Sequence, residues 1–244
     1  MILCCGEALI DMLPRQSAVG ETAFAPYAGG AVFNTAIALG RLGAPSGFLS
    51  GLSSDFFGDL LRDSLTASGV DTRYAVSSDR PTTLAFVRLV DGQASYAFYD
   101  ENTAGRMLSA DDLPVLSAAV TALFFGGISL ISEPCGSAYE ALMARVAGSR
   151  VTMIDPNIRP GFVADETGYR ARIGRMMAMA DIVKLSDEDL HWLEGSRETE
   201  VLARGILLSG PKLVIITRGA EGASGYTSAS EWMFRLRQSR LPTR

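Results

Sequence analysis

Histidine and cysteine are scarce in this sequence of 244 residues, which contains one histidine and three cysteines. Cys4 and Cys5 are adjacent and Cys135 is distant, so the chain has neither a disulfide framework nor the spacing of a metal site. We therefore predict three reduced, buried thiols. His191 lies in a helical pattern beside Trp192, which argues against a Ser-His-Asp triad and against zinc sites built from histidine.

Long apolar runs and basic runs are also missing. No segment approaches the ~20 apolar residues of a membrane-spanning helix, and Glu7 and Asp11 interrupt any secretory apolar stretch near the start. The net charge of −5 argues against nucleic acid as a partner, because neutralisation of phosphates dominates that binding. We expect a cytoplasmic protein that binds small molecules, with no nucleic acid and no membrane as partners.

Two glycine-rich phosphate motifs are absent as well. The sequence contains neither Gly-x-Gly-x-x-Gly nor Gly-x-x-x-x-Gly-Lys-Ser/Thr, which disfavours a dinucleotide fold and a Walker-type loop. What the sequence does contain is an alternation of strand-length apolar runs and amphipathic helical stretches. This pattern is typical of an α/β protein with a mainly parallel sheet covered by helices.

The elements can be placed by their residue ranges. Strands are predicted at 2–10, 46–52, 122–125, 151–154, 182–185 and 213–217, and helices at 32–42, 57–68, 135–147, 168–178, 187–193 and 201–208. Two β-rich runs between 82 and 99 are joined by Asp91-Gly92, a strong hairpin signal. Because ligands bind beyond the carboxyl ends of the strands in such open sheets, candidate site residues are sought there.

Three polar clusters follow predicted strands. They are Asp155-Pro156-Asn157-Ile158-Arg159-Pro160, the segment Ser186–Asp189 with Lys184 before it, and Thr217-Arg218-Gly219-Ala220-Glu221-Gly222. Each also has a purely structural interpretation. The first could be a salt-bridged loop, the second a helix start with Ser186 as N-cap and Asp189 in the capping-box position, and the third a plain turn.

A fourth cluster lies near the start of the chain. Asp11 follows the first strand, Gly29-Gly30 precedes a helix, and Asn34 lies in the first turn of that helix. The glycines would let a ligand approach the backbone, while Asp11 and Asn34 offer an acceptor and an amide for hydroxyl groups. This segment is predicted to hold a small polar substrate, although a plain turn before a helix remains the alternative.

Taken together, these segments resemble the PfkB (ribokinase-like) family of carbohydrate kinases, and within it the fructokinases. The resemblance covers about residues 1–226. It rests on Gly6-Glu7-Ala8-Leu9-Ile10-Asp11, Gly29-Gly30-x-x-x-Asn34, Asp55-x-x-Gly58, Phe98-Tyr99-x-Glu101-Asn102-Thr103-Ala104, Asp155-Pro156-Asn157-x-Arg159-Pro160, Lys184-Leu185-Ser186-x-x-Asp189 and Thr217-x-Gly219-x-x-Gly222.

The resemblance implies a fold and a set of ligands. The fold would be a ribokinase-like three-layer α/β/α sandwich over residues 1–230, with a small β lid inserted from about 11–30 and 82–100. The activity would be ATP-dependent phosphorylation of a sugar hydroxyl, with Mg²⁺ bridging the nucleotide phosphates and no direct protein ligand to the metal. In relatives the lid often also forms a homodimer interface.

Residue roles are likewise implied by the resemblance. Sugar contacts would come from Asp11, Gly29, Gly30, Asn34, Phe98, Asp100 and Arg159. Nucleotide and phosphate contacts would come from Asn157, Lys184, Ser186, Asp189, Thr217, Gly219 and Gly222. Relatives usually have Glu where this chain has the shorter Asp189.

Asp100 bears on the choice of sugar. Relatives that act on 2-keto-3-deoxygluconate usually carry Arg here, which can pair with the substrate carboxylate, whereas Asp100 would repel it. On a strand, Asp100 would share a face with Phe98. A neutral sugar, fructose, is therefore favoured over 2-keto-3-deoxygluconate, and a nucleoside is a further alternative.

The sequence departs from the family in one respect. It has no Gly-Ala-Gly-Asp segment, whose amides form an anion hole and whose Asp is the catalytic base in the family. Residues 231–244 do not resemble the family, which we interpret as a truncation or frame change that would impair phosphoryl transfer and leave one face of the sheet exposed. A non-catalytic sugar-binding or regulatory protein is therefore the alternative function.

Overall fold

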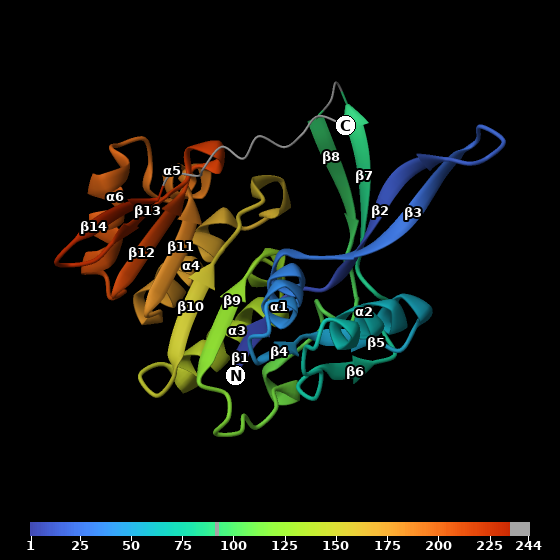
Figure 1. Cartoon of the computed structure of the whole chain (residues 1–244), viewed down its shortest axis with the longest axis horizontal. Coiled ribbons are helices and arrows are strands. Elements are labelled where there is room, and N and C mark those ends of the chain that lie inside the picture. The colour runs from blue at the N-terminus through green and yellow to red at the C-terminus, as the bar shows by residue number, and fades with distance from the viewer. Residues whose placement is uncertain (91–92, 235–244) are drawn as a thin grey trace.

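The computed structural model describes residues 1–90 and 93–234. Its centre is an eight-stranded sheet in the order β14-β13-β12-β11-β10-β9-β1-β4 (Figure 1). These strands are β1 (Ile2–Cys5), β4 (Ser46–Leu49), β9 (Ala122–Gly126), β10 (Val151–Asp155), β11 (Ile182–Ser186), β12 (Leu213–Thr217), β13 (Ala223–Tyr226) and β14 (Glu231–Phe234). All neighbouring pairs from β4 to β12 are parallel, as the sequence predicts.

Within residues 1–90 and 93–234, six α-helices connect and cover these strands. They are α1 (Ala31–Arg41), α2 (Phe56–Ala67), α3 (Cys135–Val146), α4 (Glu166–Met179), α5 (Asp187–Glu194) and α6 (Thr199–Leu208). Each lies within two residues of its predicted bounds, because the spacing of the apolar residues fixes which face of each helix is buried. No helix in the described part of the chain is long and apolar enough to cross a membrane.

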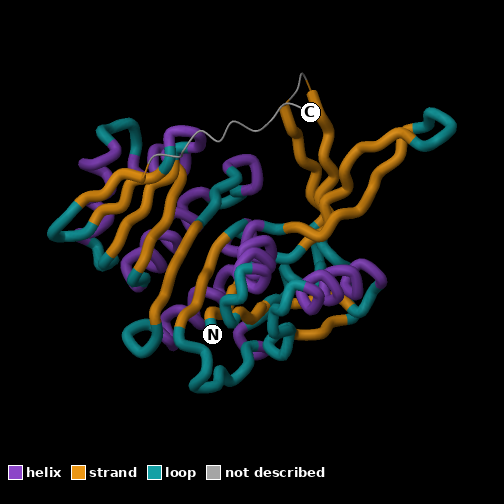
Figure 2. Tube along the Cα trace, viewed as in Figure 1, coloured by secondary structure: helices purple, strands orange, loops and turns teal. Residues whose placement is uncertain are grey.

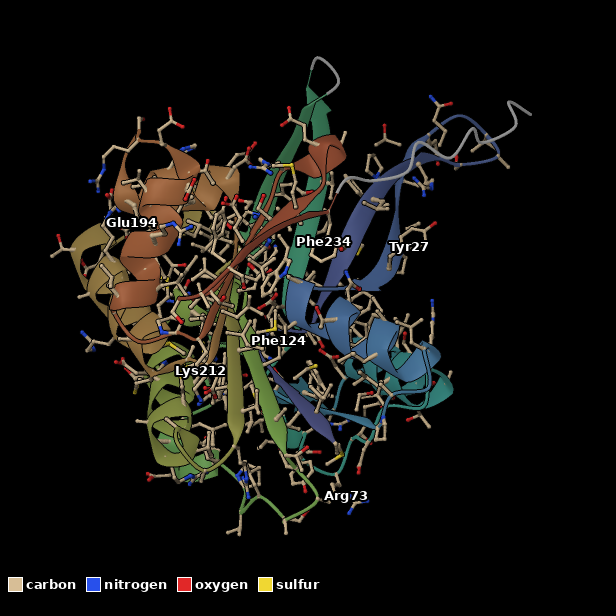
Figure 3. The ribbon with its side chains drawn as sticks, turned by 60° about the vertical axis from the view of Figure 1, so that its left-hand side comes forward. Tyr27, Arg73, Phe124, Glu194, Lys212 and Phe234 are labelled. Carbon is tan, nitrogen blue, oxygen red and sulfur yellow. The ribbon has the colours of Figure 1, made fainter. Side chains whose placement is uncertain are left out.

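Alternate residues of the strands pack on opposite faces of the sheet. Leu3 and Cys5 of β1 join the core beneath α3 to α6, whereas Cys4 joins the core beneath α1 and α2. Figure 3 shows Phe124 of β9 inside the molecule, where its side chain belongs to the second of these cores. The three predicted free cysteines are buried. The three-layer α/β/α prediction is thus confirmed.

Helix cover differs between the two faces. Over β10 to β12, the described helices α4, α5 and α6 pack on one face only, and the opposite face carries Met153, Ile182, Leu213 and Ile215, all partly exposed. The register aligns Met153 with Ile182 and Ile182 with Leu213, and Ile215 lies two residues after Leu213, beside Lys184. These four apolar side chains are here called the apolar strip. Figure 2 shows the helices gathered to one side of these strands.

A separate four-stranded sheet forms the β lid. Its order is β3 (Thr22–Gly29), β2 (Leu9–Gln16), β7 (Leu84–Val90) and β8 (Gln93–Tyr99), and both ribbons extend away from the main sheet (Figure 1). The register pairs Val90 with Gln93, while the predicted Asp91-Gly92 turn lies outside the described residues.

The Asp55 carboxylate anchors the lid to α2. It accepts hydrogen bonds from the Gly58 amide (2.8 Å), the Thr82 amide (2.9 Å) and the Thr82 hydroxyl (2.7 Å). Asp55 is thus the N-cap of α2 and also fixes the residues that precede β7. The Asp55-x-x-Gly58 motif therefore fixes where the β7–β8 part of the lid begins.

Two predicted strands are each divided in the structure. The segment 2–10, expected as one strand, contains β1 and the start of β2, which belong to different sheets. The break between them begins at Gly6, where an added Cβ would overlap the Val32 side chain. The expected strand 46–52 is β4 and β5 (Gly51–Ser53), and β5 pairs with β6 (Val76–Ser78). A Cβ on Gly51 would overlap the Ala104 carbonyl, so a close backbone approach marks the second break.

The last described strands are antiparallel. β13 pairs with β12, and β14 pairs with β13, which places Glu231–Phe234 in the main sheet. The non-family tail expected at 231–244 therefore begins with a strand of this sheet, and its residues 235–244 lie outside the described part.

Candidate sugar and nucleotide site

A cavity of about 240 Å³ lies between the main sheet and the lid, and it is here called the sugar cavity. It brings together six of the predicted site residues, namely Asp11, Gly30, Asn34, Phe98, Asn157 and Arg159. They come from β2, the start of α1, β8 and the loop after β10. Segments more than 120 residues apart thus converge at one place, as expected for the carboxyl edge of a parallel sheet.

Gly29 and Gly30 shape the floor of the sugar cavity in different ways. A Cβ on Gly29 would overlap the Asp11 carboxylate, so glycine here gives Asp11 its position. Gly30 has φ 110° and ψ 139°, and a Cβ there would lie 2.9 Å from the Glu7 carbonyl oxygen. Such a backbone conformation is close to exclusive to glycine.

Glu7 holds this floor together from beneath. Its carboxylate accepts hydrogen bonds from the amides of Ala31 (2.8 Å), Val32 (3.3 Å) and Ser129 (3.5 Å). Helix α1 has no N-cap side chain of its own, so Glu7 supplies the missing acceptor. Burial raises the pKa of the Glu7 carboxyl, and the amide hydrogen bonds oppose this shift.

The polar groups of the sugar cavity suit hydroxyl groups. Burial raises the pKa of the Asp11 carboxyl. The Arg159 guanidinium donates to the carbonyl oxygens of Asn157 and Ile158. Asn157 has φ 45°, a left-handed conformation that asparagine tolerates better than most residues. The carboxylate of Asp11, the amide of Asn34 and the guanidinium of Arg159 therefore line one space. Phe98 and Tyr96 line it on the lid side.

Asp100 differs from the expected placement. It lies beyond the end of β8 and does not line the sugar cavity. Its carboxylate instead accepts from Arg106 (3.2 Å) and from the Ser132 hydroxyl (3.2 Å). Phe98 therefore lines the sugar cavity without Asp100, which follows the end of β8 at Tyr99 and whose carboxylate is bound by a nearby cation.

The predicted nucleotide residues lie at the adjoining strand ends. Ser186 at the end of β11 is aligned with Thr217 at the end of β12. The Ser186 hydroxyl accepts from the Asp189 amide (2.9 Å), as expected for an N-cap. Gly219 and Gly222 have φ 48° and 99° and bound the turn that follows β12. Lys184, Ser186, Asp189, Thr217, Gly219 and Gly222 are thus gathered at one edge, beside but outside the lining of the sugar cavity.

Two carboxylates at this edge could assist a divalent cation. Asp155 forms an ion pair with Lys184 (2.8 Å), and its second oxygen is buried without a hydrogen-bond partner. Burial, together with the negative charge of Asp155, raises the pKa of the Asp189 carboxyl. Among the described residues no group of three or more His, Cys, Asp or Glu side chains could hold a metal ion. These carboxylates fit Mg²⁺ that keeps several waters and is held mainly by nucleotide phosphates.

Sequence reasoning missed part of the site. Glu7, Leu9, Ala31, Tyr96 and Ile128 also line the sugar cavity. Glu7 and Leu9 belong to the motif Gly6–Asp11, but their residue types alone do not indicate that they line a cavity. The alternation Tyr96, Phe98 along a strand is the one signal that could have placed Tyr96 beside Phe98, and the two rings are stacked with centroids 5.7 Å apart.

Comparison with known proteins assigns the family. The model of the pfkB family carbohydrate kinases matches residues 1–236, which include the first residues of the 231–244 segment that was not expected to resemble the family. The chain thus belongs to this family and is a carbohydrate kinase, a phosphotransferase that acts on a sugar. It is 60% identical to a fructokinase of Rhizobium leguminosarum bv. trifolii over 227 residues, which are 93% of this chain and 70% of that protein.

Solved structures agree with this assignment. A fructokinase of Xylella fastidiosa with bound ATP has a TM-score of 0.88 and 29% identity, covering 99% of this chain and 75% of that one. A double-mutant fructokinase of Vibrio cholerae O395 in a fructose-, ADP- and potassium-bound form has a TM-score of 0.85 and 26% identity, covering 96% and 75%.

Proposed function

We propose that this chain binds fructose in the sugar cavity and acts as an ATP-dependent kinase toward one of its hydroxyl groups. The observation that carries the proposal is the convergence of Asp11, Asn34 and Arg159 around a cavity of about 240 Å³ beside the Lys184–Asp189 edge. The names of the similar proteins, one with fructose and one with ATP bound, support both ligands. Mg²⁺ would supply charge neutralisation between the nucleotide phosphates, assisted by Asp155 and Asp189.

The residues have distinct tasks in this proposal. The Asp11 carboxylate accepts hydrogen bonds from sugar hydroxyls, and the Asn34 amide and Arg159 guanidinium donate to sugar oxygens. Phe98 covers an apolar face of the ring. The Lys184 ammonium lies at the phosphate side, where its charge is balanced by Asp155 until a nucleotide binds.

Isothermal titration calorimetry with fructose, combined with an assay of ADP release from ATP, tests the proposal. Fructose binding that is lost in Asp11→Asn supports it. Binding of adenosine or of 2-keto-3-deoxygluconate in preference to fructose would assign the chain to those substrates instead. Glu21→Gln, on the exposed turn of the lid, is the matched control because Glu21 does not line the sugar cavity.

A non-catalytic role is the second candidate. The 244 residues contain no Gly-Ala-Gly-Asp segment, so we expect binding to exceed turnover for these residues taken alone. Fructose binding without ADP release would favour a sugar-binding or regulatory function. ADP release that depends on fructose would show that another group replaces the missing base.

We also propose that the lid mediates a homodimer. Phe24, Phe86 and Tyr99 form edge-to-face contacts on the lid face that points away from Asp11, and Phe24 and Tyr99 are 42% and 62% exposed. Exposed aromatic clusters of this kind favour association. Light scattering should show a dimer for the unaltered protein and a monomer for Phe24→Glu, and a monomer for both would exclude this interface.

A further inference from the structure

A second and larger cavity of about 650 Å³ lies behind the sugar cavity, on the side of α3 and α4, and is here called the outer cavity. Phe98 lines the sugar cavity and Phe162 lines the outer cavity. The two rings meet edge to face with centroids 4.1 Å apart. We name Phe98 and Phe162 together the aromatic wall.

A polar cluster also lies between the two cavities, beside the aromatic wall. The Asp100–Arg106–Ser132 cluster lines the outer cavity and also a space of about 20 Å³ whose other lining residues include Glu7 and Ile128. Glu7 and Ile128 in turn line the sugar cavity. A space of this size holds about one water molecule, so nothing the size of a sugar ring passes there.

The charges of the outer cavity point to neutral ligands. Arg106, Arg172 and Arg175 line it together with Asp100, Glu133 and Asp165. Arg106 pairs with Asp100, and Arg172 pairs with Glu133. Arg175 pairs with Glu140, so each of the three guanidinium groups already has a carboxylate partner. A net anion therefore gains little there, whereas hydroxyl groups can both donate to and accept from such pairs.

We propose that Phe162 determines substrate size by backing Phe98, so that the site accepts a monosaccharide and rejects fructose that carries a second sugar ring. The proposal rests on the proposed function, because it deepens the substrate class of the same cavity. A steric clash excludes a larger ligand from a site that a smaller one fits. Truncation of Phe162 frees Phe98 to turn aside and joins the sugar cavity to a space lined by groups that bind hydroxyls.

The test is calorimetry with fructose and with three disaccharides whose second ring is attached at different fructose oxygens, namely turanose, lactulose and isomaltulose. We expect the unaltered protein to bind fructose and none of the disaccharides. In Phe162→Ala, and more strongly in Phe98→Ala/Phe162→Ala, at least one disaccharide should gain about tenfold or more in affinity. The attachment point that gains identifies the oxygen facing the aromatic wall.

Three further variants control the result. Phe162→Leu replaces Phe162→Ala if the latter does not fold, as judged by its thermal melt. Phe162→Trp retains a bulky wall and should show no gain, and Phe56→Ala removes an exposed aromatic that lines neither the sugar cavity nor the outer cavity. Fructose binding that persists in the double variant with no disaccharide gain overturns this inference alone. Absence of fructose binding by the unaltered protein overturns the proposed function and this inference with it.

Discussion

Replacing Gly29 and Gly30 by alanine, one at a time, separates the stability of the sugar cavity floor from its chemistry. At Gly30 the positive φ of 110° costs a side chain about 1–3 kcal/mol, and the contact of 2.9 Å to the Glu7 carbonyl oxygen adds to this because backbone must move. We expect Gly30→Ala to lose roughly 2–4 kcal/mol, which for a chain of this size lowers the Tm by roughly 5–10 °C.

At Gly29 the overlap is with a side chain. A Cβ there would push the Asp11 carboxylate aside, and φ at Gly29 is not in the left-handed region. The stability of Gly29→Ala should therefore change by less than about 1 kcal/mol, while the loss of a hydrogen bond to a charged group, about 1.5–3 kcal/mol, weakens fructose binding roughly 10- to 100-fold.

Urea unfolding and fructose calorimetry on the two variants measure both effects. The reasoning fails if Gly29→Ala binds fructose as tightly as the unaltered protein, or if Gly30→Ala unfolds at the same urea concentration. Gly20→Ala serves as control for positive φ alone, since Gly20 has φ 83° with no atom within 4 Å of an added Cβ, and it should cost stability without affecting fructose.

Two other variants and one pH dependence give equally direct outcomes. Glu7→Gln keeps one acceptor oxygen for the α1 amides but places its NH₂ group against the Ser129 amide. This should lower the free energy of unfolding in urea by about 1–2 kcal/mol. Unchanged stability would show that one acceptor oxygen suffices. The pKa of Asp11 is raised, so fructose affinity should fall with decreasing pH beginning above the usual range of an aspartate, and an affinity flat down to pH 4 would contradict the role of Asp11. The effect of pH on stability has the opposite sign. Because the folded protein holds a proton on Asp11 more tightly than the unfolded chain does, the contribution of Asp11 to stability decreases as the pH rises from the ordinary pKa of an aspartate to the raised pKa. Gly174→Ala lies inside α4 with open space around an added Cβ, so it should stabilise by about 0.5–1 kcal/mol without altering fructose binding, and destabilisation would indicate an unrecognised contact.

The sequence predicted the α/β layers and the convergence of the motif residues because periodicity and strand ends carry that information. It did not place Asp100, whose neighbour Arg106 lies in a loop where side-chain direction follows no period. It also missed the division of strand 46–52, because the cause is the approach of Ala104, more than 50 residues away. The role of Glu7 was equally hidden, since its partners Ala31 and Ser129 meet only in the folded chain.

The apolar strip formed by Met153, Ile182, Leu213 and Ile215 affects how the protein behaves in concentrated solution. Apolar surface exposed to water self-associates more strongly when excluded salts are present. Ammonium sulfate should therefore precipitate this protein at low saturation, and chaotropic or low-salt buffers should keep it dispersed. We therefore expect a sheet face that no described helix covers to affect solubility, even though it lies apart from the residues that line the sugar cavity.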